Sequence, residues 1–122
     1  ITTVFAFAAG PGEAQIRPSY SAVTEKLAGL WAARYPVSPS RIEADPGKKG
    51  VLAATDAGRL VYYYRFMLQF PLPFRDDKGA LSSKGERKIE LWVRYRSWEA
   101  EPYDISFVRM DRLPGADKRW VK

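Results

Sequence analysis

The stretch that decides the fold is "RLVYYYRFMLQF", from Arg59 to Phe70. Successive side chains of a strand point to opposite faces of a sheet, so an apolar residue at every second position predicts a strand with one apolar face. The apolar side chains at this spacing are Leu60, Tyr62, Tyr64, Phe66, Leu68 and Phe70. The other face carries Val61, Tyr63, Arg65, Met67 and Gln69. We expect the first of these faces to line the core.

A second long strand is predicted for "IELWVRYRSW", from Ile89 to Trp98. One of its faces would hold Ile89, Leu91, Val93 and Tyr95, and the other Glu90, Trp92, Arg94, Arg96 and Trp98. The segment between the two long strands is short and polar, so they are predicted to be antiparallel neighbours. Two tryptophans and two arginines then share the face opposite the core, which is the unusual feature of the sequence.

One helix is predicted within "RPSYSAVTEKLAGLWAARYP", residues 17–36. Its apolar side chains recur at helical spacing, at Val23, Leu27, Leu30 and Trp31. Ser19 or Ser21 can cap the N-terminus, because a serine hydroxyl accepts from the free amides of the first turn. Pro36 cannot continue the helical hydrogen bonds, so the helix should stop at Tyr35.

The rest of the chain predicts shorter elements. Before the first long strand they are a short strand plus an irregular lead-in within residues 1–18, an extended piece at 41–44, and a brief strand from Val51 with a turn at 56–58. After the second long strand, a third long strand with ambiguous alternation is predicted at 105–113, followed by a basic tail at 114–122. The element order is therefore β-α-β-β-β-β.

This order predicts an α+β fold in a single domain over residues 1–122. One N-terminal helix would pack across a curved antiparallel sheet of about four to five strands. The order resembles that of cystatin-like and NTF2-like domains, an analogy of element order that rests on no specific motif. The inhibitory cystatins carry a Gln-x-Val-x-Gly hairpin loop, whereas the comparable turn here reads "ATDAGR". The resemblance therefore implies a fold and no protease inhibition.

The composition excludes several chemistries. The chain has neither histidine nor cysteine, which removes the commonest general base, thiol nucleophiles and thiolate metal sites. The glycines of "GPGE" and "PGKKG" do not complete a phosphate-binding fingerprint. We therefore predict a protein that is not an enzyme and that needs no metal or other cofactor.

The net charge of +6 is unevenly distributed. Residues 1–58 hold six basic and five acidic side chains, whereas residues 59–122 hold fourteen and nine. A basic surface raises the odds of an anionic partner, although many basic domains are simply soluble.

The face opposite the core is the predicted partner-binding site. Its residues are Tyr63, Arg65, Met67, Trp92, Arg94, Arg96 and Trp98. Tryptophan, tyrosine, methionine and arginine are enriched at protein interfaces, and aromatic side chains on a sheet can also stack nucleic-acid bases. A third alternative is self-packing, in which the arginines stack on the tryptophans of the same face. We expect a binding or assembly module that docks a protein partner or a second copy; the alternative function is binding of single-stranded nucleic acid.

That prediction has a direct consequence for one pair of residues. Replacing Trp92 and Arg94 with alanine is expected to abolish capture of the partner and to leave stability nearly unchanged.

Localisation stays open, with an extracytoplasmic placement favoured over a cytoplasmic one. No membrane span is expected, because the apolar run "TTVFAFAAG" is far shorter than the ~20 residues needed to cross a bilayer.

Overall fold

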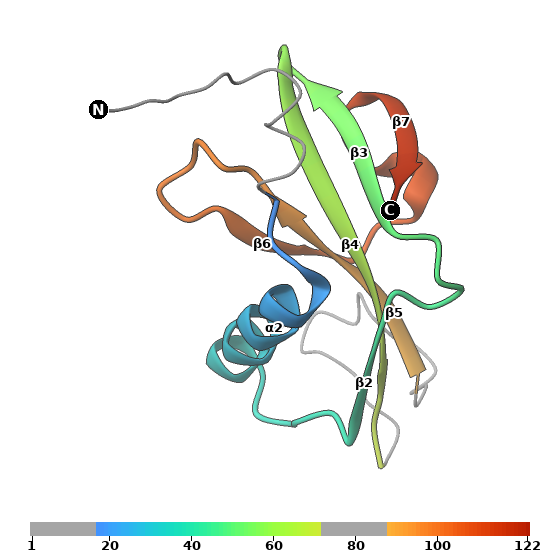
Figure 1. The fold of residues 1–122 in the computed structure, drawn as a ribbon. Coiled ribbons are helices and arrows are strands. Elements are labelled where there is room, and N and C mark those ends of the chain that lie inside the picture. Colours follow the sequence, from blue (N-terminus) through green and yellow to red (C-terminus); the bar gives the residue numbers. More distant parts are fainter. Residues whose placement is uncertain (1–16, 72–87) are drawn as a thin grey trace.

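The computed structural model describes residues 17–71 and 88–122. In these ranges one helix packs on an antiparallel sheet of six strands, which confirms the α+β class (Figure 1). The elements are α2 (Tyr20–Arg34), β2 (Arg41–Ala44), β3 (Val51–Asp56), β4 (Arg59–Gln69), β5 (Lys88–Tyr95), β6 (Tyr103–Ser106), the 3-10 helix η2 (Met110–Arg112) and β7 (Ala116–Val121). The expected first strand, and the polar segment between the two long strands, lie outside the described residues.

Strand β4 is the centre of the sheet, whose order is β6-β5-β4-β3-β7. It pairs with β5 along one edge, with Arg65 opposite Trp92. The other edge of β4 is shared by two strands in turn, since β2 pairs with Phe66 to Gln69 and β3 with Arg59 to Tyr63. The predicted antiparallel pairing of the two long strands is therefore correct.

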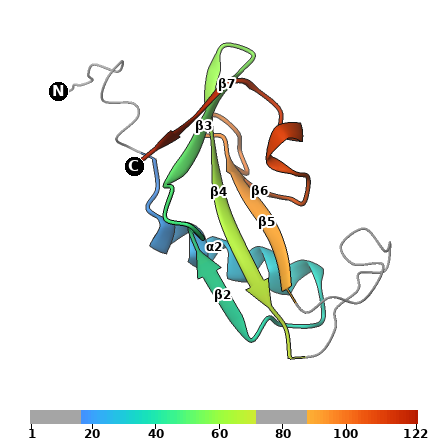
Figure 2. The same cartoon turned by 90° about the vertical axis from the view of Figure 1, so that its right-hand side faces the viewer.

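The helix begins and ends as the sequence predicts. The Ser19 side chain accepts a hydrogen bond from the amide of Ala22 at 3.1 Å, and Tyr35 is the C-terminal cap. Val23, Leu27 and Trp31 are buried on the side of α2 that faces the sheet. Figure 2 shows the helix crossing behind the strands, on one face of the sheet only.

The main core lies between this helix and the predicted apolar face of the sheet. Its buried strand residues include Tyr62, Tyr64, Phe66, Leu68, Phe70, Ile89, Leu91 and Val93. The period-two pattern predicts each of these buried positions. A side chain on the covered face of a sheet loses its contact with water, and an apolar side chain can be buried there without the cost of an unpaired polar group.

Two expectations about the C-terminal third are wrong. The supposed basic tail contains strand β7, which pairs antiparallel with β3, so the sheet has six strands instead of four to five. The predicted long strand at 105–113 ends at Ser106 and gives way to η2. Strand β7 reads as a tail because three of its six side chains are charged, as is usual for an edge strand whose outer side faces water.

Candidate docking surface on the second sheet face

Half of the second sheet face is covered by the chain itself. The buried residues there are Leu52, Ala54, Val61, Tyr63, Trp92 and Leu113, with Trp98 and Trp120 packed against them. Leu113 comes from the segment that follows η2, and the next residue, Pro114, accepts a 2.7 Å hydrogen bond from the Tyr63 hydroxyl. These residues form a second small core, which we call the rear core.

The rear core removes two predicted site residues from the surface. Tyr63 is 0% exposed and Trp92 is 2% exposed. The expectation that their side chains face water or a partner is therefore wrong for this fold. Burial also raises the pKa of Tyr63 above its ordinary value, so its hydroxyl stays protonated and serves as a hydrogen-bond donor.

Three further predicted residues border the rear core. Arg94 forms an ion pair with Asp104 at 2.9 Å, and Arg96 is half-buried. Trp98 is also half-buried, and the guanidinium over its ring, 5.2 Å from the centroid, belongs to Arg59. The self-packing alternative thus describes this half of the face, although the cation on Trp98 is not one of the two arginines expected there.

The other half of the second face remains half-exposed or exposed. It holds the last two predicted residues, Arg65 and Met67, together with Gln69 of the same strand and side chains of β2 and β5. We define the open face as Arg41, Glu43, Arg65, Met67, Gln69, Lys88 and Glu90.

Strand register arranges the charges of the open face in rows. Met67 lies between Glu43 on β2 and Glu90 on β5, which makes an acidic row. Gln69 lies in the same way between Arg41 and Lys88, which makes a basic row. Positions two apart on a strand are separated by ~7 Å, so the two rows run side by side across three strands.

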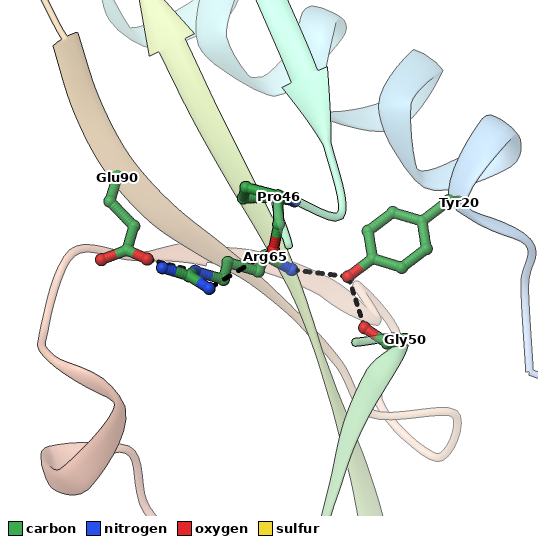
Figure 3. Close-up of polar contacts among 5 residues, drawn as sticks. All are labelled: Tyr20, Pro46, Gly50, Arg65 and Glu90. Carbon is green, nitrogen blue, oxygen red and sulfur yellow. Dashed lines mark hydrogen bonds and ion pairs between the residues drawn. The ribbon is translucent and has the colours of Figure 1, made fainter. Parts of the chain in front are cut away.

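Arg65 adjoins the acidic row and is held in place (Figure 3). Its guanidinium is paired with the carboxylate of Glu90 and donates to the carbonyl of Pro46 at 3.4 Å. Its backbone amide donates to the hydroxyl of Tyr20 at 3.0 Å. The Arg65 side chain is 28% exposed. An arginine fixed in this way loses little conformational entropy when it binds a partner.

Among residues 17–71 and 88–122, no three carboxylates gather as a possible metal site. Burial raises the pKa of Tyr20 to about 12 and also raises that of Tyr64, so neither hydroxyl is a ready base near neutral pH. No helix in the described part of the chain is long and apolar enough to cross a membrane.

The sequence analysis did not predict five of the seven residues of the open face. Arg41, Glu43 and Lys88 are not singled out by the sequence pattern, and Gln69 and Glu90 are placed on this face but not among the partner-binding residues. Their grouping depends on the pairing of β2 with β4, since a four-residue strand among prolines and charges shows little periodicity. The available signal was the alternation within β5, which puts Lys88 and Glu90 on one face with Trp92.

Comparison of the chain with protein-family models, with curated proteins and with solved structures finds no match.

Proposed function

We propose that this chain is a non-enzymatic assembly module that docks a second copy of itself through the open face. The observation that carries the proposal is the register of its charged rows, which places two carboxylates and two cations in parallel across three strands. Symmetric dimers use the same patch on both subunits, so the patch must be complementary to itself.

The rows satisfy that condition. Consider a two-fold axis that lies in the interface, parallel to the rows and midway between them. Rotation about this axis brings the acidic row of one copy over the basic row of the other. Glu43 then faces Arg41, and Glu90 faces Lys88, in both directions. On the middle strand Met67 faces Gln69 of the other copy, where its flexible apolar side chain can be desolvated.

The same geometry disfavours nucleic acid on this face. Arg65 is paired with Glu90, and the carboxylate of Glu43 adds a second negative charge. A phosphate backbone approaching these strands would meet two carboxylates. The alternative function that the sequence suggested therefore has weak support at its predicted location.

The oligomeric state of the purified chain tests the proposal. Sedimentation should show a monomer–dimer equilibrium that shifts toward monomer as salt rises, because charged pairs at a wet interface are screened. Reversing the acidic row, with Glu43→Lys and Glu90→Lys, should leave only monomer. Reversing the basic row, with Arg41→Glu and Lys88→Glu, should do the same.

Mixing the two reversed variants is the decisive step. One variant then carries only basic rows and the other only acidic rows, so the mixture should form a heterodimer. A matched control reverses Glu25 and Glu99, which are exposed elsewhere, and should dimerise like the parent. A parent chain that stays monomeric at its highest soluble concentration overturns the proposal. So does a mixture that forms no heterodimer.

A further inference from the structure

A second charged surface lies at the end of the molecule where β7 finishes beside the segment that enters α2 (Figure 2). The Arg17 guanidinium donates to the carbonyl of Lys122 at 2.8 Å, and the Lys122 ammonium donates to the carbonyl of Lys48 at 3.2 Å. These residues line an open depression of about 560 Å³. Side chains from distant parts of the sequence thus meet at one place.

This basic end carries a strong excess of positive charge. The cations that line the depression or lie beside Trp120 are Arg17, Lys48, Lys49, Lys118 and Lys122, and the carboxylate of the depression is Asp45. Both oxygens of Asp45 accept from the amide of Gly50, at 3.0 and 3.2 Å, so this carboxylate is used within its own loop. None of the four lysines forms an ion pair with a carboxylate of the described residues.

An aromatic ring lies among these lysines. Trp120 is half-buried, and strand alternation places Lys118 and Lys122 on its side of β7, each ~7 Å away along the strand. The ammonium of Lys49 lies 6.0 Å from the Trp120 ring centroid. Trp120 also packs against Trp92 of the rear core, with 6.0 Å between ring centroids, which fixes the ring in place.

We propose that the basic end binds single-stranded nucleic acid. The lysines neutralise successive phosphates, and a base takes the place of the Lys49 ammonium on the Trp120 ring. Cations along a backbone path with an aromatic platform between them are the elements that sequence-tolerant single-strand binding requires. An acidic peptide would satisfy the lysines but would gain nothing from the ring, so the ring decides between these two polyanions.

This site is separate from the open face and independent of dimer formation. It is built from the loop before β3, the start of α2 and strand β7, whereas the open face is built from β2, β4 and β5. Loss of one activity by substitution should therefore leave the other intact.

The experiment titrates the full chain with a fluorescein-labelled oligothymidine at 50 and 200 mM salt. If three phosphates are neutralised, single-strand affinity should fall about 20-fold between these salt concentrations. The triple variant Lys48→Gln, Lys49→Gln, Lys122→Gln should lose most of the affinity and most of its salt dependence. The Trp120→Leu variant should weaken binding at both salt concentrations without changing the slope.

A control variant that loses the same number of positive charges tests whether binding depends on this site or only on the net positive charge of the chain. The variant Lys26→Gln, Arg109→Gln, Arg112→Gln removes three positive charges at exposed positions outside both surfaces and should bind like the parent. Equal losses in the two triple variants would overturn the proposal. It would also be overturned by oligoglutamate competing as well as oligothymidine, or by the absence of oligothymidine binding at 50 mM salt.

Discussion

The hydroxyl of Tyr20 takes the place of a strand partner for Arg65. It accepts from the Arg65 amide at 3.0 Å and donates to the carbonyl of Gly50 at 2.8 Å (Figure 3). Strand β2 ends at Ala44 and β3 begins at Val51, so the edge of β4 is left without a strand between them. One helix side chain thereby closes the break and ties α2 to the sheet and to the loop beside the basic end.

Replacing Tyr20 with phenylalanine tests the strength of this connection. The ring contacts with Tyr64 and Phe66 remain, while the Arg65 amide and the Gly50 carbonyl each lose a partner. A half-buried amide without a partner costs about 1–3 kcal/mol, so the free energy of unfolding measured by urea titration should fall by that amount. Tyr95→Phe is the matched control, because the Tyr95 hydroxyl makes no hydrogen bond to the described residues. Equal stability of the two variants would contradict the bridging role.

The same hydroxyl predicts a loss of stability in alkali. Burial, the largest cause, raises the pKa of Tyr20 from 10.0 to about 12. Above pH 10 the unfolded chain therefore loses this proton before the folded chain does, and the unfolded state is favoured. The contribution is complete below pH 10 and disappears as pH rises toward 12. Urea titrations at pH 9 and pH 11 should show a smaller difference in Tyr20→Phe than in the parent, and an unchanged difference would contradict the assignment.

The sequence predicts the main core well because both of its faces are set by local periodicity. The alternation from Leu60 to Phe70 and the helical spacing from Val23 to Trp31 each mark one buried surface, and two apolar surfaces in a small chain must cover each other. Nothing from outside these segments is needed for that inference.

The rear core was not predicted because it depends on contacts between distant segments. Leu113 and Trp120 cover Tyr63 and Trp92 only because the chain crosses back after β6 and forms β7. The pattern around Trp92 is the same whether a partner or the protein's own C-terminal segment covers it. For the same reason the open face, whose rows depend on the pairing of β2, appears only in the structure.

The approach of β7 to the loop before β3 makes Gly50 a sensitive position. A Cβ added there would lie 2.2 Å from the carbonyl oxygen of Val121, and the backbone φ of +96° already disfavours any other residue. Gly50→Ala should therefore displace the end of β7 and lower the melting temperature. Hydrogen exchange should show faster exchange of the Trp120 and Val121 amides.

Gly58 provides the control for this substitution. Its φ is +79°, but an added Cβ meets nothing within 4 Å. Gly58→Ala should thus carry only the backbone cost of about 1–2 kcal/mol. If Gly50→Ala destabilises the protein no more than Gly58→Ala, the close contact with Val121 does not constrain β7.

Because Trp92 is buried, its replacement should lower stability, whereas the sequence analysis predicts almost no change in stability. Trp92 contributes to the rear core and contacts Trp120, so Trp92→Ala should leave a large cavity and cost about 3–5 kcal/mol in the free energy of unfolding. Met67→Ala, on the half-exposed part of the same face, should cost about 1 kcal/mol or less. The two variants should also differ in assembly, since Met67 lies on the middle strand of the open face, whereas Trp92 belongs to the rear core. A Trp92→Ala variant with the stability of the parent would show that the rear core opens in solution, and would return Trp92 to the set of surface residues.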